Sequence, residues 1–497
     1  MRFKPFISIL FVSLLLLSAG VFAQTTVTGN VSGTWNTGGA PYLLIDDCTV
    51  QTGESLIIEP GVEIIISDSK SLNVYGKISA VGTASQHITF RAVNSSVKFN
   101  KVYVINGSSA PPVSEFKYCD FTDSQIGLYL HAYGRIDNAY TTLKTIVSNC
   151  NYDSSVSTGI YVRAQAKDAS QYMTPKRRHA KVSPTIDGCT FNGNGVGIEM
   201  YTQGAGSIYY STGNTAAIIQ NNIFMESSGA AISMLPGSLN RGTPFFVNNT
   251  IVDCERGIWI QDGDFNAITI NNIFYGTTTA IERTGSNSSI TYFNCFYDNT
   301  VDFVGYPPAY GDIVLSNANG DPCDMGFNIF QDPLFEDAQF HLASSSPCIE
   351  AGKDSIEVSD VWYYAPDHDL IGNPRPMPVE ARPDMGAWET DYHTSIDSDR
   401  EVSIPASYKL SQNYPNPFNP MTTIDYSVVT RSQVTISIYS ILGREINTIL
   451  NEEKSAGNYS IQWNGEDSEG NRVASGIYFY QIKAGDFINS KKMLMLK

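Results

Sequence analysis

Apolar and polar residues alternate in many short segments along this chain, and long amphipathic helical patterns are nearly absent. One pattern pairs a Cys or Asn with an apolar residue two positions later; it recurs at Cys119–Phe121, Cys150–Tyr152, Cys189–Phe191, Asn222–Phe224, Asn249–Ile251, Asn272–Phe274 and Asn294–Phe296. Eight or nine residues after the first six come short apolar runs opened by a small residue, at Gly127–Leu130, Gly159–Val162, Gly197–Met200, Ala231–Met234, Gly257–Ile260 and Ala280–Arg283. Two linked motifs at a constant offset predict stacked repeats of short strands.

The repeat length of about 20 to 40 residues fits the coils of a parallel β-helix, because stacked coils bury apolar faces that one coil cannot. Residues i and i+2 of a strand point the same way, so Cys119 and Phe121 should both point inward. A buried Asn must satisfy its amide. We therefore expect Asn222, Asn249 and their equivalents on later coils to bond one another in a ladder. The alternative is a β-sandwich with Asn-rich loops.

The region before the repeats has the pattern of a cap for such a β-helix. Leu56, Ile58, Val62, Ile64 and Ile66 alternate with other residues on both sides of a Pro-Gly turn. This spacing predicts two short, half-buried strands.

Four insertions follow the Gly-led runs at the same corner of successive coils: 131–143, 163–183, 203–216 and 235–244. Loops at one corner of stacked coils form a wall along one side. Their candidate ligand-binding residues are Tyr172, Lys176, Arg177, Arg178, His179, Tyr209 and Tyr210, with Trp259, Asp262 and Asp264 on a later coil. Aromatic faces stack on sugars and Arg binds carboxylates, which favours an anionic glycan. Ordinary exposed loops and a solvated turn at Asp262 are the alternatives.

The first residues form the pattern of a secretory signal peptide. Arg2 and Lys4 precede the apolar run 7–17, and Val21–Ala23 forms a small-x-small cleavage site, so cleavage is expected between Ala23 and Gln24. A single membrane anchor is the alternative. No later apolar stretch is long enough to span a bilayer.

The composition limits the classes of molecule that this protein is expected to bind. The 497-residue chain is acidic, with 32 Lys and Arg against 49 Asp and Glu. Nucleic acid is therefore not expected as a partner, because phosphate binding needs a basic face. Abundant Tyr, Phe and Gly indicate an all-β protein with many turns.

The last part of the chain differs from the repeats. After a polar linker at 393–404 come Tyr408–Pro420, the alternating run Val434–Tyr439, Trp463–Gly470, Gly476–Tyr480 and a Lys491–Lys497 ending. This series resembles the C-terminal sorting domain of type IX secretion, an immunoglobulin-like fold related to the FlgD Ig-like domain. The resemblance implies that residues 405–497 engage the export machinery and direct the protein to the outer cell surface or the medium. A purely structural Ig-like domain is the alternative.

The body of the chain also resembles a known group. The ordered series Asn328–Phe335, Phe340–Leu342, Ser346–Gly352, Gly372–Pro376 and Asp384–Glu389 is similar to the closing coils of right-handed parallel β-helix proteins of the pectate-lyase-like superfamily. The resemblance implies an all-β chain, with the β-helix over residues 24–392. Enzymes of that superfamily act on acidic polysaccharides, but no catalytic constellation is legible in the repeats.

Two functions thus remain open: a non-catalytic protein that binds glycan or another surface, and a lyase or hydrolase of uronic-acid polysaccharide. No cofactor is expected apart from calcium, for which Asp367, Asp369 and Asp384 are weak candidates beside the alternative of a structural loop. Cys323 and Cys348, both in the closing region, are the best pair for a disulfide.

Overall fold

All regular secondary structure among the described residues is β-strand, joined by turns and irregular segments. The computed structural model describes residues 24–106, 112–134, 139–166, 178–204, 212–235, 237, 240–261, 265–285, 288–307, 309–377, 381–392, 408–428, 432–454, 457–485 and 487–496. Within these ranges no helix could cross a membrane. The chain divides between Thr394 and Ser395 into two compact units. The predicted linker at 393–404 lies outside the described residues.

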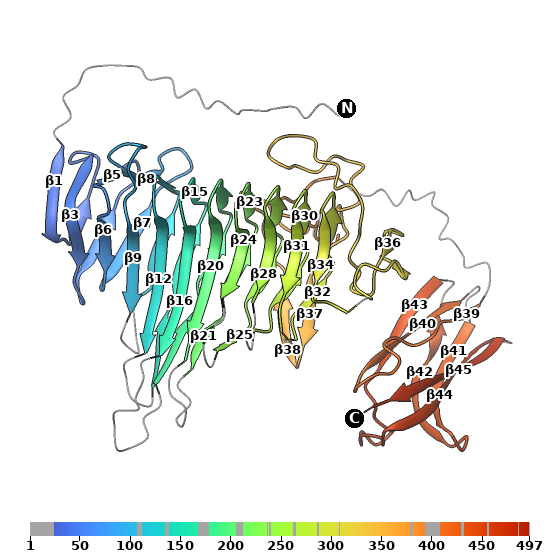
Figure 1. Ribbon diagram of the computed structural model, residues 1–497. Helices are drawn as coiled ribbons and strands as arrows, with labels where there is room; N and C mark the ends of the chain where they lie inside the picture. The colour runs from blue at the N-terminus through green and yellow to red at the C-terminus, as the bar shows by residue number, and fades with distance from the viewer. Residues whose placement is uncertain are drawn as a thin grey trace, which may run out of the picture. The chain divides into compact units, whose positions relative to one another are not determined.

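The first unit consists of coils whose strands form three parallel stacks (Figure 1). The first stack contains β5 (Glu63–Ile66), β8 (Ile88–Ala92), β11 (Cys119–Thr122), β15 (Asn151–Asp153), β19 (Thr190–Asn192), β23 (Ile223–Met225), β27 (Thr250–Val252), β30 (Ile273–Tyr275) and β33 (Cys295–Tyr297). The second contains β6 (Ser71–Val74), β9 (Lys101–Asn106), β12 (Ile126–Gly134), β16 (Thr158–Ala166), β20 (Val196–Gln203), β24 (Ala230–Leu235), β28 (Arg256–Ile260), β31 (Thr279–Arg283) and β34 (Val301–Val304). β1 (Thr25–Asn30) pairs with the long β3 (Tyr42–Val50), which pairs with both β5 and β6 and so joins the two stacks.

The third stack runs through β2 (Gly33–Trp35), β4 (Ser55–Ile58), β7 (Lys77–Val81), β10 (Ser114–Lys117), β14 (Thr145–Ser148), β18 (Thr185–Asp187), β22 (Ile218–Gln220), β26 (Phe245–Val247), β29 (Ile268–Ile270) and β32 (Ile290–Tyr292). β4 and β5 are the two strands predicted for the cap, and Leu56, Ile58, Val62, Ile64 and Ile66 are all buried. The repeat therefore encodes a parallel β-helix, as predicted.

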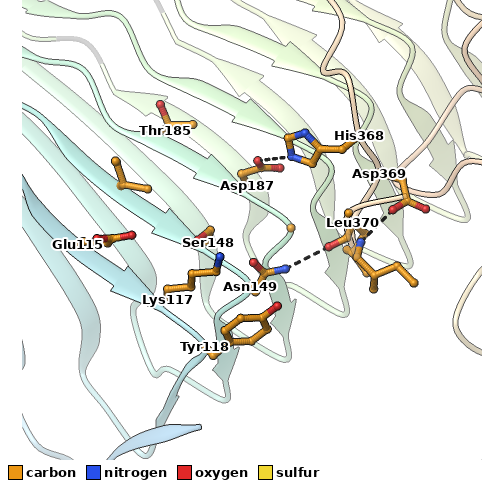
Figure 2. Close-up of a pocket in the computed structure, with 14 residues that line it drawn as sticks. Glu115, Lys117, Tyr118, Ser148, Asn149, Thr185, Asp187, His368, Asp369 and Leu370 are labelled. Atoms are coloured by element: carbon orange, nitrogen blue, oxygen red, sulfur yellow. Dashed lines mark hydrogen bonds and ion pairs between the residues drawn. The ribbon is translucent and has the colours of Figure 1, made fainter. Parts of the chain in front are cut away.

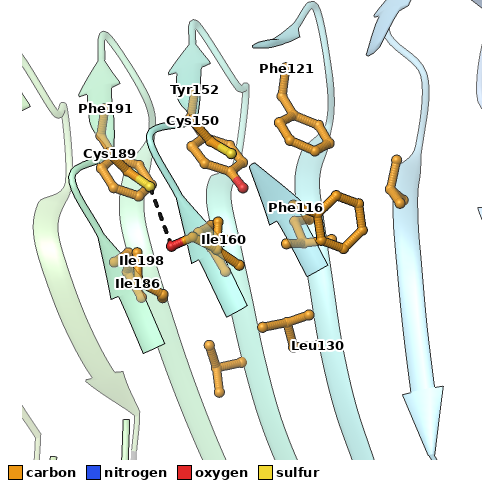
Figure 3. Close-up of a cluster of buried hydrophobic side chains, with 14 of the residues drawn as sticks. Phe116, Phe121, Leu130, Cys150, Tyr152, Ile160, Ile186, Cys189, Phe191 and Ile198 are labelled. Atoms are coloured by element: carbon orange, nitrogen blue, oxygen red, sulfur yellow. Dashed lines mark hydrogen bonds between the residues drawn. The ribbon is translucent and has the colours of Figure 1, made fainter. Parts of the chain in front are cut away.

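Stacked side chains fill the interior of the β-helix (Figure 3). The rings of Phe90, Phe121, Tyr152, Phe191 and Phe224 follow one another at centroid distances of 4.6 to 4.9 Å and within 7° of parallel. Cys119, Cys150 and Cys189 form the next column and are fully buried free thiols. The inward orientation predicted for Cys119 and Phe121 is confirmed.

The predicted Asn ladder is present and longer than expected. Asn222 donates from its backbone N and Nδ2 to Asn249 Oδ1, at 3.0 and 2.9 Å. The same pair of bonds repeats from Asn249 to Asn272 and from Asn272 to Asn294. The ladder then continues through Asn328 to Asp324. Each amide also donates to a backbone carbonyl, so these buried polar groups are satisfied.

The predicted wall is a β-sheet rather than a row of irregular loops. The insertions contribute β13 (Ala139–Leu143), β17 (Arg178–Val182), β21 (Gly213–Thr215) and β25 (Asn240–Gly242), which pair in parallel. They pack against the extended ends of β12, β16 and β20, and we call this two-layered projection the fin. The two layers approach closely: a Cβ atom on Gly213 would lie 2.6 Å from the carbonyl oxygen of Ala164.

The chain after the last coil folds back over the outer face of the third stack. We call residues 365–392 the closing segment. Asn149, Asn248 and Asn271 occupy left-handed corners just before the inward column and donate from Nδ2 to the carbonyls of Leu370, Asp384 and Lys353. These corner amides fix the returning chain on three coils, those of β15, β27 and β30.

The second unit is a small β-sandwich. One antiparallel sheet contains β39 (Lys409–Leu410), β40 (Thr422–Val428) and β43 (Gly457–Trp463). The other contains β42 (Glu445–Lys454), β41 (Ser432–Ser440), β44 (Gly476–Ala484) and β45 (Phe487–Met495). Alternate residues such as Ile424, Ile436, Tyr480 and Met493 fill its core with Trp463. This matches the immunoglobulin-like architecture predicted for the region.

The predicted Cys323–Cys348 disulfide is not formed. All eight cysteines are free and buried, and these two pack in one apolar cluster with Cys295 and Ile329. Burial raises the pKa of the Cys348 thiol well above its usual value, and the neighbouring Cys295 adds to the effect. The three thiols thus behave as small apolar residues of the closing coils.

Candidate functional site

Most of the predicted ligand-binding residues lie outside the part of the chain that the structure describes. Tyr172, Lys176, Arg177, Tyr209, Tyr210, Asp262 and Asp264 lie outside the described residues, as does the signal segment 1–23; Gln24 is the first described residue. Arg178 corrects the prediction of an exposed basic run, because it is only 5% exposed on the inner side of β17. His179 faces outward, where its ring stacks on Tyr140 at 4.6 Å and Nδ1 lies 2.9 Å from Thr212 Oγ1.

The outer side of the second stack carries a group of rings that we call the aromatic face: Tyr103, Tyr129, Tyr161, Tyr201 and Trp259. In Figure 1 their strands β9, β12, β16, β20 and β28 lie along one side of the β-helix. Tyr103, Tyr129 and Tyr161 occupy the same register position on three coils, with ring centroids 4.8 and 4.7 Å apart. The strand alternation that buries Leu128 and Leu130 sends Tyr129 outward.

Basic groups lie among these rings. Lys101 Nζ lies 5.3 Å from the Tyr103 centroid and 5.2 Å from that of Tyr129. Arg163 donates from Nη1 to Tyr129 Oη at 3.2 Å and lies over the Tyr201 ring at 5.4 Å. The buried Nε of Arg163 has no hydrogen-bond partner among the described residues. Arg163 Nη2 donates to Gln203 Oε1 at 3.4 Å. Each Nη atom keeps a second N–H group with which the guanidinium can donate to a carboxylate.

The electrostatics of the face reflect partial burial. Burial lowers the pKa of Lys101. Burial is also the main cause of the raised pKa of Tyr161, and burial raises the pKa of Glu199, which pairs in register with Tyr161 on the next coil. His131 Nδ1 lies 2.6 Å from Tyr103 Oη. The face therefore combines partly dehydrated cations with one carboxyl group that resists ionisation.

Trp259 is the one residue of this face that we predicted. Arg256 lies over its ring at 4.7 Å and donates from Nε to Glu282 Oε2 at 2.8 Å. The tyrosines were missed, although the sequence contains their signal: Tyr129 and Tyr161 are each the third residue of a Gly-led run. An outward ring at a fixed place in successive repeats marks a continuous surface.

The acidic calcium candidates have other roles. Asp369 accepts backbone N–H groups of Ile371 and Asn373, and Asp384 accepts those of Glu350 and Thr390. Asp367 instead binds His368. Within the described ranges there is no group of three or more His, Cys, Asp or Glu arranged to hold a metal ion. Asp369 and Asp384 thus organise turns of the closing segment.

A polar pocket of about 430 Å³ lies where the closing segment crosses β10, β14 and β18 (Figure 2). Glu115, Lys117 and Ser148 belong to its floor, and residues 368–372 form one side. His368 bridges two carboxylates: its Nε2 lies 2.8 Å from Asp187 Oδ2 and its Nδ1 lies 2.7 Å from Asp367 Oδ1. This bridge fastens the closing segment to β18.

We expect the His368 bridge to weaken as pH rises. Burial alone would lower the pKa of His368, but the hydrogen bond that His368 donates to Asp367 and the charge of Asp187 outweigh burial, and the pKa is raised. The stabilisation is therefore complete below the ordinary histidine pKa of about 6.5 and is lost as pH rises through the higher folded-state value. Hydrogen exchange of residues 366–373, corrected for intrinsic rates, should show this loss.

The variant His368→Gln should remove that pH dependence. The matched control is His341→Gln, since His341 pairs with Asp337 away from the pocket. An unchanged pH profile in His368→Gln would contradict the assignment.

Comparison with known proteins supports the fold of both units. Residues 104–320 match the family described as right-handed β-helix region, and residues 424–486 match the FlgD Ig-like domain. The first unit is thus a right-handed parallel β-helix and the second an Ig-like domain, as predicted. The search of curated proteins finds no match.

Two solved structures from Porphyromonas gingivalis show partial similarity. Dimeric latent PorU shares 20% identity over 18% of this chain and 9% of its own, with a TM-score of 0.16. PorZ, described as an essential bacterial surface component of the type IX secretion system, shares 21% identity over 20% of this chain and 13% of its own, with a TM-score of 0.14. Similarities this limited carry no argument about function.

Proposed function

We propose that this protein is exported to the cell surface or the medium and there binds an anionic glycan, without catalysis, along the aromatic face. The observation that carries the proposal is the column of Tyr103, Tyr129 and Tyr161, with Arg163 hydrogen-bonded to its middle ring. Tyrosine rings offer apolar faces to sugars, and a guanidinium recognises carboxylates with two parallel bonds.

The arrangement suits an extended polymer better than a small ligand. The rings of Tyr103, Tyr129 and Tyr161 repeat over three coils, so a chain lying along the β-helix axis meets one ring at each of these three steps of about 4.8 Å. Lys101 and Arg163 place positive charge on this face in a chain whose net charge is −17. A local basic region in an acidic protein selects anionic partners by attraction there and repulsion elsewhere.

We predict that Arg163→Met weakens binding of a uronic-acid polymer about tenfold, the effect of losing one charged hydrogen bond of about 1.4 kcal/mol. Titration calorimetry with polygalacturonate and with alginate, at low and high salt, measures the change. The matched control is Lys181→Met, which removes a cation from the opposite layer of the fin. Equal affinity in Arg163→Met and wild type would reject the aromatic face as the binding surface.

A lyase is the second candidate, and one observation favours it. Burial raises the pKa of Glu199. Glu199 lies in register with Tyr161 on the neighbouring strand, and Arg163 is two residues after Tyr161. A proton-holding carboxyl near an arginine and a tyrosine can serve general acid–base chemistry on a uronate. Incubation with uronic-acid polymers, with and without calcium, distinguishes the two candidates. Unsaturated products that absorb in the ultraviolet would replace the binding proposal with the lyase.

The export proposal rests on the second unit and the signal-like start of the chain. The motif series of this unit resembles a type IX sorting domain, and the resemblance implies an Ig-like fold, which agrees with the β-sandwich of the second unit. We predict that a variant lacking residues 405–497 accumulates inside the cell envelope of its own host, whereas the full chain reaches the surface or medium. Fractionation and immunoblotting measure the distribution. Normal secretion of the shortened variant would leave the second unit with a structural role only.

A further inference from the structure

One β-hairpin of the first unit has two four-residue antiparallel strands, whereas the strands of the coils are parallel. We call it the aromatic hairpin: β37 (Ser355–Val358) and β38 (Val361–Tyr364). Ser359 and Asp360 form its turn, with φ angles of 52° and 63°. Two successive left-handed residues are typical of a type I′ turn, which matches the twist of paired strands.

One side of this hairpin accounts for its attachment. Ile356, Val358 and Tyr363 pack against the outer, apolar side of β26 and β29. The Tyr363 ring meets that of Phe245 edge-on at 5.4 Å. The hairpin therefore covers an apolar part of the third stack with its inner residues alone.

The other side is exposed and aromatic. Trp362 and Tyr364 alternate with Tyr363, so they point away from the β-helix, and they are 53% and 65% exposed. Their ring centroids lie 6.4 Å apart and their planes differ by 28°. Neither ring contributes to the apolar cluster beneath the hairpin. Large aromatic residues that packing does not require mark a binding surface.

The charges around these rings restrict the ligand. Glu357 pairs in register with Trp362 and is exposed, and Asp354 and Asp360 flank the strands. Lys353 lies 3.6 Å from Asp354 and is thus already paired. An acidic border repels polyanions, while the faces of Trp and Tyr favour the C–H faces of sugar rings.

We propose that the aromatic hairpin is a second binding site, specific for uncharged polysaccharide, with Trp362 and Tyr364 each stacking on one sugar ring. The two rings lie two residues apart on β38 with centroids 6.4 Å apart, so they fit two positions along one chain. The site is independent of the aromatic face, which carries cations and takes an anionic polymer. One protein could in this way connect two chemically different glycans.

The test uses the full mature chain with insoluble cellulose and with soluble cellohexaose as uncharged probes. Wild type should sediment with cellulose, and cellohexaose should shift the emission of the exposed Trp362. Trp362→Ala and Tyr364→Ala should each weaken binding about tenfold, the effect of losing one stacked ring. Trp362→Phe should recover part of the affinity. The control is Tyr140→Ala, which removes a ring of the fin that is 55% exposed and should leave binding unchanged.

Four results would overturn the proposal. The first two are failure of wild type to bind both probes and equal binding by wild type and the alanine variants, because either would show that the hairpin does not bind the polysaccharide. Acrylamide should quench the fluorescence of Trp362 in wild type, and this quenching should be absent from Trp362→Ala. Little quenching of Trp362 in wild type would instead show that another part of the chain covers the hairpin. A dimer in light scattering that Trp362→Ala dissociates would assign the surface to a second copy. Unchanged polygalacturonate binding in all hairpin variants is expected, and it separates this test from that of the aromatic face.

Discussion

Replacing Asn249 by alanine should lower the free energy of unfolding by about 3–5 kcal/mol. Its Oδ1 accepts two hydrogen bonds from Asn222, and its Nδ2 donates to Ile219 O and to Asn272 Oδ1. Alanine leaves the buried N–H of Asn222 without an acceptor and creates a small void. Each orphaned buried group costs about 1–3 kcal/mol. Chemical denaturation followed by circular dichroism and fluorescence measures the loss.

The matched control for the ladder is Asn151→Ala. Asn151 belongs to an earlier coil and is exposed, and its Nδ2 donates to Asp120 at 2.7 Å. Exposed substitutions change stability by about 0.5 kcal/mol or less. A similar effect of both variants would show that the ladder contributes no more than a surface hydrogen bond. Stacked coils contact only their neighbours, so parts of the β-helix can unfold separately. The unfolding midpoints from circular dichroism and from fluorescence should therefore be compared before a two-state fit is made.

Replacing Arg375 by methionine should detach the closing segment and lower stability by about 3–5 kcal/mol. Arg375 Nε lies 2.9 Å from Glu389 Oε2, and the two side chains are 1% and 0% exposed. Its Nη1 donates to Asn221 Oδ1 and its Nη2 to Gly386 O. Methionine fills much of the space but leaves the buried Glu389 carboxyl group, Asn221 Oδ1 and Gly386 O without the donors that Arg375 supplies. Limited proteolysis and hydrogen exchange within residues 381–392 measure the release.

The loss should depend on pH in a defined direction. Burial, and then the charge of Asp384, raise the pKa of Glu389 to about 8 even though Arg375 opposes the shift. Removing Arg375 raises this pKa further, so the folded state holds a proton that the unfolded state releases above about pH 4.3. Wild type and variant should therefore both lose stability as pH rises above about 4.3, and the variant should lose more than wild type only above about pH 8, where Glu389 ionises in wild type.

Two further variants test the Arg375 interpretation. Arg375→Met combined with Glu389→Gln should recover part of the stability and lose the pH dependence that Glu389 causes, because a glutamine at this position does not titrate. Arg382→Met removes an exposed arginine of the same segment and should have little effect. Equal losses in the single and double variants would show that packing around Arg375, rather than its charge, holds the segment.

Much of the β-helix could be predicted because its signal is local and repeated. The alternation at Cys119–Phe121 and Asn222–Phe224 gives side-chain direction directly, since a strand has a period of two. A buried amide has few ways to be satisfied, so the ladder followed from spacing alone. The cap strands at Leu56–Ile58 and Glu63–Ile66 were readable for the same reason.

The candidate sites were less predictable because they combine residues that are distant in sequence. Arg178 was expected on an exposed loop, but the insertions pair as strands and β17 turns it inward. Asp187 and His368 come together only because the closing segment returns over the third stack. Asp369 and Asp384 suggested calcium by composition, yet backbone amides occupy their oxygens.

The dipeptides Asn248–Asn249 and Asn271–Asn272 each contain one residue whose role the sequence pattern determines and one whose role only the tertiary structure determines. The second Asn of each enters the ladder, which the repeat determines by itself. The first Asn holds the returning chain: Asn248 donates to Asp384 O in the closing segment, and Asn271 donates to Lys353 O just before that segment. A periodic pattern specifies contacts between neighbouring coils, because each coil repeats the same geometry. Contacts with a segment more than 80 residues away form only when the chain folds back. The pocket and the aromatic hairpin could therefore be identified only from the tertiary structure.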